Sequence, residues 1–204
     1  MIIEQPACFL RWMYPHAVWR MDSTEKVVYL TFDDGPIPQA TPFILDTLDR
    51  YGIHATFFMV GENAERYPDL LDEVRRRGHR IGNHTHNHIA GQKYLSVNYL
   101  LNTQRANETL HTDLFRPPHG WMKPLQYRVL RRQGYRIIMW DLVTRDYSRC
   151  LTAQDVLCNV QRYARPGSII TFHDSLRSID KLRQVLPACL EWLRDQGYAF
   201  GVIP

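Results

Sequence analysis

Residues 27–36 read VVYLTFDDGP, and this stretch decides the fold class. Apart from one leucine, its first six residues are β-branched or aromatic, a composition typical of a buried strand. The strand ends at DDGP, where glycine and proline predict a loop. Residues 41–51 then have the apolar spacing of an amphipathic helix. The stretch therefore opens a strand–loop–helix unit, which is the repeating unit of a parallel sheet covered by helices.

The same unit recurs to the end of the sequence. Further strands are predicted at 55–60, 79–83, 114–116, 135–140, 168–172 and 198–203. Further helices are predicted before Gly78 and at 96–111, 124–133, 152–165 and 181–196. These units predict an α/β fold, a deformed (β/α) barrel with about seven parallel strands, since 204 residues is short of the usual ~250. We expect residues 27–204 to form a single domain and residues 1–26 to form an N-terminal segment packed on the barrel.

The composition is that of an ordinary globular protein. Hydrophobic residues make up 45% of the chain and charged residues 23%, and the net charge of +4 is too small to indicate a nucleic-acid partner. No apolar run approaches the ~20 residues of a transmembrane segment. The N-terminus lacks a basic region followed by an apolar one, which predicts no signal peptide and favours a cytoplasmic location. We expect a monomer.

The four cysteines form no C-x-x-C pair, and their irregular spacing indicates neither a zinc ribbon nor a disulfide framework. They are Cys8, Cys150, Cys158 and Cys189. We therefore expect buried free thiols.

Titratable residues collect where the predicted strands end. In chain order they are Asp33 and Asp34, then His84, His86 and His88, then Arg116 and His119, then Asp141 and Asp146, then His173 and Asp174. The carboxyl ends of parallel barrel strands meet at one rim, where the active sites of such barrels lie. The sequence therefore predicts that these side chains converge on one site.

A metal site is predicted within this group. His84 and His88 are four residues apart, so one turn can direct both imidazoles at one ion, and a carboxylate is a usual third ligand. His86 is a weaker candidate, because side chains at i and i+2 point apart on a helix. Taken alone, the histidines would also suit a polar hydrogen-bonded loop, and the two aspartates would suit a simple turn.

Four motifs occur in order along the chain: TFDDG at 31–35, HTHNH at 84–88, RPPHG at 116–120 and FHD at 172–174. They resemble the motifs of the polysaccharide deacetylases, the NodB-homology domain of carbohydrate esterase family four. The resemblance runs from about Val27 to the C-terminus and implies a NodB-like barrel that removes acetyl groups from N-acetylated sugars of a peptidoglycan- or chitin-like glycan.

The resemblance also implies residue roles. The metal ligands would be Asp34, His84 and His88, and zinc is the expected ion, although Co²⁺ or Ni²⁺ would also suit the ligands. The catalytic residues would be Asp33 as general base, Arg116 as its partner, His119 as a backbone oxyanion donor, His173 as general acid and Asp146 as the residue that orients His173. Tyr147 and Thr171 would contact the substrate, and Trp121 is the best candidate for stacking on a sugar ring, because aromatic faces suit the apolar side of sugars.

The sequence departs from the family pattern at four positions. His119 replaces an aromatic Tyr or Phe, Val143 and Tyr147 replace Asp and Trp, and Thr171 replaces a Leu that lines the acetyl pocket. These changes put the groove shape, the acyl preference and the role of Asp146 in question, but none removes a ligand, base or acid.

Two rival functions stay open from the sequence. The first is hydrolysis of another small amide or ester on the same scaffold, and the second is a non-catalytic carbohydrate-binding module. Serine catalysis is disfavoured because the chain has no G-x-S-x-G elbow, and the lack of G-x-G-x-x-G and Walker A loops argues against nucleotide binding.

Overall fold

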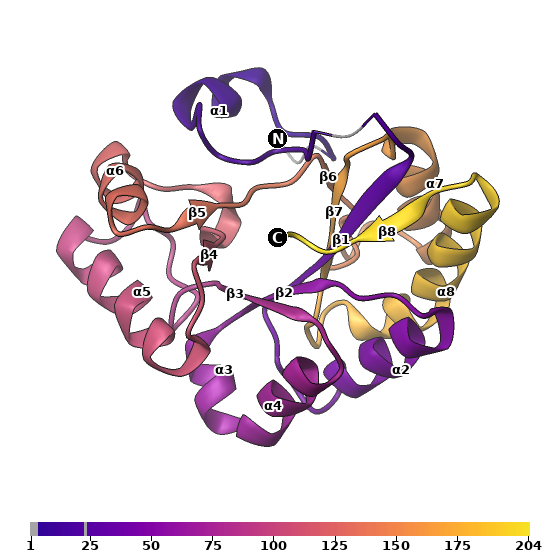
Figure 1. Cartoon of the computed structure of the whole chain (residues 1–204), viewed down its shortest axis with the longest axis horizontal. Helices are drawn as coiled ribbons and strands as arrows, with labels where there is room; N and C mark the ends of the chain where they lie inside the picture. Colours follow the sequence, from indigo (N-terminus) through magenta and orange to yellow (C-terminus); the bar gives the residue numbers. More distant parts are fainter. Residues whose placement is uncertain (1–3, 23) are drawn as a thin grey trace.

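In the computed structural model, which describes residues 4–22 and 24–204, a sheet of strands curls around a centre with helices outside it (Figure 1). The strands are β1 (Val27–Asp33), β2 (Thr56–Met59), β3 (Arg80–Asn83), β4 (Leu114–Phe115), β5 (Arg136–Ile137), β6 (Leu142–Val143), β7 (Ile169–His173) and β8 (Ala199–Gly201). Their order is β5-β4-β3-β2-β1-β7-β6, with parallel neighbours, and β8 pairs with the start of β1. The predicted α/β fold, a deformed (β/α) barrel with about seven parallel strands, is confirmed.

Helices lie on the outer side of the sheet, and most of them connect successive strands (Figure 1). They are α1 (Cys8–Met13), α2 (Thr41–Tyr51), α3 (Gly61–Arg66), α4 (Pro68–Arg76), α5 (Ser96–Leu110), α6 (Pro124–Arg132), α7 (Ala153–Tyr163) and α8 (Ile179–Asp195), with a short 3₁₀ turn η1 (Pro118–Gly120). Within the described ranges, no helix is both long enough and apolar enough to cross a bilayer.

Side-chain alternation along β1 separates the core from the site. Phe32 points outward and stacks with Phe57 of β2 and Phe172 of β7, with ring centroids 5.0 and 5.8 Å apart. All three rings are buried, and truncating such a ring to alanine typically costs ~3–5 kcal/mol. Because neighbouring residues of a strand face opposite sides, Asp33 points into the barrel. The β1–β7 register pairs Asp33 with His173, which brings these two residues side by side.

The N-terminal segment spans the opening of the barrel between β5 and β6 (Figure 1). Val18 bridges in parallel to Ile138, and Arg20 bridges in antiparallel fashion to Ser168. Further along the opening, the carbonyl of Glu4 accepts a hydrogen bond from the Val143 N–H at 2.8 Å. The described residues of the segment therefore contact both sides of this opening, while residues 1–3 and 23 of the predicted 1–26 segment lie outside the described ranges.

One predicted strand is wrong in its extent. The run at 135–140 forms only the short β5, and the chain then turns away and makes β6, which pairs with β7 instead. The sequence could not show this break, because it depends on which neighbouring strand pairs with each half of the run. The helix α3 was also not predicted.

The prediction of buried thiols is wrong for three of the four cysteines. All four are free, but only Cys189 is buried, whereas Cys8, Cys150 and Cys158 are exposed.

Candidate metal and catalytic site

The structure brings together the three predicted metal ligands at the carboxyl ends of β1 and β3. Asp34, His84 and His88 each offer one ligand atom, and these atoms all lie within 4.8 Å of one another. The Asp34 Oδ1 is 3.2 Å from His88 Nε2 and 3.8 Å from His84 Nε2. Ligands on a tetrahedral ion with bonds of ~2.0–2.2 Å lie about 3.4 Å apart. The spacing therefore suits a shared cation.

The protonation states also suit a cation. His84 Nδ1 lies 2.8 Å from the carbonyl oxygen of Arg116, which can only accept, so Nδ1 donates and Nε2 keeps its lone pair towards Asp34. Burial, followed by the nearby His88, holds the pKa of His84 well below its usual range. Although burial alone would raise it, the His88 hydrogen bond and the charge of His173 hold the pKa of Asp34 well below its usual range. Neutral imidazole and ionised carboxylate are the forms that bind a divalent metal.

Backbone strain is concentrated at this rim. Six described residues other than glycine have positive φ, and five of them belong to the strand-end loops of the site. They are Asp34, Thr85, His88, His119 and Arg145. Such conformations cost of order 1–3 kcal/mol each for a residue with a side chain and persist only where the surroundings enforce them. The loops are therefore held in a defined shape at some cost in stability.

Asp33 is held by a buried guanidinium. Arg116 Nη1 donates to Asp33 Oδ1 at 2.6 Å and to Thr31 Oγ1 at 2.8 Å, and Arg116 is fully buried. Its other nitrogens donate to the carbonyls of Ile138 and Met139, so the guanidinium cannot move freely. Burial raises the pKa of the Asp33 carboxyl above its ordinary value, and the Arg116 charge opposes part of that rise. A carboxylate with a raised pKa is a better proton acceptor at neutral pH.

His173 has a carboxylate partner of its own. Its Nδ1 lies 2.8 Å from Asp146 Oδ1, and its backbone N–H donates to Asp146 Oδ2 at 2.7 Å. Burial would lower the pKa of His173, but the charge and hydrogen bond of Asp146, with the charges of Asp34 and Asp33, raise the pKa to about 9. A cation bound at Asp34 would oppose part of this rise. The imidazole is thus poised to hold a proton near neutral pH.

The remaining predicted residues lie around this centre. The His119 ring is 4.8 Å from the His88 ring, and the Tyr147 ring is 4.6 Å from the His173 ring. Trp121 is half-buried and its ring lies 5.8 Å from Phe9 of α1. Thr171 is 1% exposed, and its hydroxyl is 3.0 Å from that of Thr31, so it belongs to the buried layer beneath the rim.

Asp141 does not join the site, contrary to the prediction. It precedes β6, and its carboxylate accepts from Arg165 at 2.6 Å and from Ser168 at 2.9 Å, at the amino-terminal end of β7. The break between β5 and β6 is the cause, because it places Asp141 before a strand and not after one. His86 is buried too, but it lies outside the three-residue metal cluster.

Two further buried residues support the site: Thr31, which was not predicted as part of it, and Asp174, which was predicted at this rim. Thr31 joins Arg116 to Thr171, and period-2 alternation could have identified it because it lies two residues before Asp33. Asp174 Oδ2 accepts from Thr41 Oγ1 at 2.7 Å beneath the loop after β1. Burial raises the pKa of Asp174 to about 8, against the effect of the Thr41 hydrogen bond. Asp174 was predicted at the rim because it follows the strand at 168–172, and the structure places it there in a buried position.

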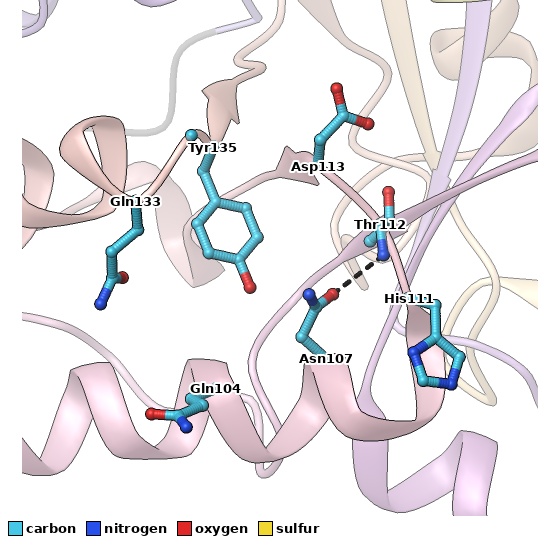
Figure 2. A pocket seen from close by; sticks show the side chains of 8 residues that line it. Gln104, Asn107, His111, Thr112, Asp113, Gln133 and Tyr135 are labelled. Carbon is cyan, nitrogen blue, oxygen red and sulfur yellow. Dashed lines mark hydrogen bonds between the residues drawn. The ribbon is translucent and has the colours of Figure 1, made fainter.

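A separate cavity of about 440 Å³ opens at the amino-terminal ends of β4 and β5. Figure 2 shows its lining, which includes Asn107, Tyr135 and Asp113, with the Asn107 side chain accepting from the Thr112 N–H. None of the predicted site residues lines it. The cavity is therefore distinct from the rim where the metal ligands lie.

Comparisons with known proteins cover nearly the whole chain. A family model described as polysaccharide deacetylase matches residues 20–138. A peptidoglycan-N-acetylglucosamine deacetylase of Bacillus cereus is 32% identical over 92% of this chain and 91% of its own. A chitooligosaccharide deacetylase of Azorhizobium caulinodans is 29% identical over 91% of this chain and 96% of its own.

Solved structures share the fold. The Bc1960 peptidoglycan N-acetylglucosamine deacetylase, in complex with 4-naphthalen-1-yl-N-oxidanyl-benzamide, has a TM-score of 0.82 and 30% identity over 95% of this chain and 94% of that chain. A mutant of BA3943 from Bacillus anthracis, described as a CE4 family pseudoenzyme with restored enzymatic activity, has a TM-score of 0.84 and 25% identity over 93% and 70% of the two chains. The fold therefore occurs in proteins described as deacetylases and in one described as a pseudoenzyme.

Proposed function

Because this chain belongs to the polysaccharide deacetylase family, we propose that it is a metal-dependent hydrolase that removes acetyl groups from N-acetylated sugars of a peptidoglycan-like glycan. One observation carries the proposal: the Asp34, His84 and His88 cluster lies beside an ion-paired Asp33 and a carboxylate-bound His173. The names of the relatives support the substrate class. A chitin-like oligosaccharide is the alternative glycan, supported by the chitooligosaccharide deacetylase.

Because one neighbour is described as a pseudoenzyme, the fold alone does not determine activity, and the residues of the site decide it. This chain has a ligand set whose atoms lie close enough to share one ion. It also has two acid–base groups, and each one is held by its own buried partner. A module that only bound sugars would need neither a proton acceptor nor a proton donor. These features favour a catalyst over a binding module.

Each of the acid–base residues has a role in the proposed reaction. Asp33 accepts a proton from the attacking water while Arg116 holds the carboxylate in place. The water oxygen bonds to the acetyl carbon, and the backbone N–H of His119 donates to the oxyanion that develops there, a contact worth about 3 kcal/mol. His173, oriented by Asp146, protonates the sugar nitrogen as the C–N bond breaks. The products are acetate and a free amine.

Asp34, His84 and His88 would hold the metal. A divalent ion bound there would act as a Lewis acid that polarises the acetamide carbonyl and brings the pKa of water towards ~7. We propose zinc, because two neutral imidazoles and one carboxylate leave the open position typical of a catalytic zinc site. Co²⁺ and Ni²⁺ also bind such ligands.

The first test measures acetate release and metal content together. The purified protein is expected to release acetate from peptidoglycan fragments, to lose at least about 100-fold of that activity after chelation, and to regain it with stoichiometric Zn²⁺. Acetate assays with metal analysis of the same samples check this. Hydrolysis of small esters or amides but of no glycan would support the alternative substrate class. Glycan binding without any metal-stimulated acetate release would support a non-catalytic module.

A second test concerns Asp146. Because Asp146 stabilises the charged imidazolium, Asp146→Asn should lower the pKa of His173. The imidazolium that acts as the general acid then loses its proton at a lower pH. The alkaline limb of the kcat/KM profile is expected to move down by about one to two pH units. Tyr147→Phe keeps the ring beside His173 and should leave that limb in place. An unmoved limb in Asp146→Asn would exclude His173 as the group that titrates there.

A further inference from the structure

The helix α1 lies outside the part of the chain that the family model matches, which begins at residue 20. It is nevertheless fixed beside the candidate site. Leu10 is buried in the core, and the Tyr14 hydroxyl accepts from the Met122 N–H at 2.8 Å and donates to the Met122 carbonyl at 2.7 Å. Met122 follows His119 by three residues. The position of α1 is thus tied to the loop that forms one wall of the site.

This helix presents an aromatic face to solvent. Phe9 and Trp12 are three residues apart and therefore lie on the same face of α1. Phe9 is 53% exposed and Trp12 is 83% exposed. Exposed apolar groups that gather in this way are typical of a surface that contacts a partner.

The aromatic face continues from the metal site in a row of rings. His88, a predicted ligand, has its ring 4.8 Å from the exposed ring of His119. His119 is followed two residues later by Trp121, so their Cα atoms are at most about 7 Å apart. The Trp121 ring then lies 5.8 Å from that of Phe9. The row leads from the reacting centre outward to α1.

The segments that supply this surface have an excess of positive charge, although Arg11, Arg105 and Arg116 pair with Asp141, Glu65 and Asp33 from other segments. Residues 5–21, 88–107 and 114–140 contain ten arginines and lysines and no aspartate or glutamate. Lys123 lies two residues beyond Trp121, and its Nζ donates to the carbonyl of Tyr94 at 2.7 Å, which joins the two loops. Lys93 is exposed in the same loop as Tyr94, five residues after His88.

We infer that α1 and the loop after β4 form an outer subsite for a glycan that carries carboxylates, next to the sugar that loses its acetyl group. Aromatic faces suit the apolar sides of sugar rings, and surface lysines such as Lys93 and Lys123 attract carboxylates. This inference rests on the proposed function and specifies its substrate as an anionic glycan in preference to a neutral one. An anionic lipid surface has related chemistry, but the row of rings that begins at His88 favours a glycan extending from the reacting sugar.

The test of the aromatic face compares substrate lengths. In the Phe9→Ala/Trp12→Ala double variant, kcat/KM for peptidoglycan hexasaccharides should fall roughly 5–20-fold through a higher KM, while kcat/KM for a disaccharide stays unchanged. Leu101→Ala is the matched control, because Leu101 is 58% exposed on α5 and lies outside the row. Thermal unfolding of each variant checks that it is folded. Trp12→Ser alone serves if the double variant is unfolded.

The test of charge uses Lys93→Gln. The preference of the wild type for peptidoglycan hexasaccharide over chitohexaose should shrink in this variant and also in 0.5 M salt, which screens exposed charges beyond ~4–5 Å. Lys26→Gln removes an exposed charge at the opposite end of β1 and should leave the preference intact.

Each outcome bears on a different claim. If wild type releases acetate and the α1 variants match it at every length, the outer subsite is wrong and the proposed function stands. If the wild type releases no acetate, calorimetry can still compare how tightly the hexasaccharide binds to the wild type and to the double variant. Weaker binding to the double variant would support the subsite, and equal binding would overturn it. Co-sedimentation with phosphatidylglycerol vesicles that depends on Phe9 and Trp12, without any effect of glycan length, would make the surface a membrane contact and overturn the inference.

Discussion

Asp33→Asn is expected to reduce turnover by about 10²–10⁴-fold while the divalent ion stays bound. The amide cannot accept the proton that the carboxylate would take from water. It still offers an oxygen to Arg116, whose Nη1 now lies 2.6 Å from Asp33 Oδ1, so the buried guanidinium keeps a partner. Measurements of kcat and of metal content on the same preparation check both parts of this result.

The control for Asp33→Asn separates chemistry from stability. Both variants remove the countercharge of the buried Arg116, but Asp33→Leu also removes the hydrogen-bond acceptor, and breaking a buried ion pair by removing one partner typically costs ~3–5 kcal/mol. The asparagine variant should therefore unfold at a higher temperature than the leucine variant. Substantial activity in a folded Asp33→Asn protein would remove Asp33 as the general base.

His84→Ala is expected to lower metal affinity by more than about 100-fold and to abolish acetate release with it. The substitution removes one of three ligand atoms that lie within 4.8 Å of one another. It also leaves the Arg116 carbonyl without the imidazole donor at 2.8 Å. Metal analysis after gel filtration, followed by titration with Zn²⁺, checks the affinity directly, and activity serves only as a second reading.

His86→Ala is the matched control for this second result. His86 lies in the same loop and is equally buried, but it is not one of the three clustered ligands. The His86→Ala variant should be less stable than the wild type, since a buried ring is deleted, but it should keep its metal. If His86→Ala lost the metal and His84→Ala kept it, the ion would bind elsewhere in the loop. The assignment of Asp34, His84 and His88 as its ligands would then be wrong.

The proposed acid and base are distinguished by their surroundings. Asp33 and His173 are adjacent in the β1–β7 register, yet one has an arginine partner and the other an aspartate partner. Burial raises the pKa of Asp33. Among the groups that raise the pKa of His173, Asp146 has the largest effect. Pairs of titratable groups with different environments are what a general base and a general acid require.

Local patterns predicted much of the fold. The strand that begins at Val27 and the helix at 41–51 are where the sequence predicts them, because alternation, apolar spacing and the Gly52 stop are local features. The break at Asp141 was not predictable, because a strand ends where its hydrogen-bonding partner ends. The place of α1 was not predictable either, since it depends on the gap that this break opens.

The sequence by itself determined the α/β class, the order of the units and the residue types brought to the strand ends, because each depends on neighbours a few positions away. Only the tertiary structure decided which of those residues meet: Asp34 with His84 and His88, Asp33 with Arg116, and Asp146 with His173 while Asp141 turns to the opposite end. The reason is physical. Register and strand order set the distance between residues far apart in the chain, and these depend on how the whole sheet pairs and closes.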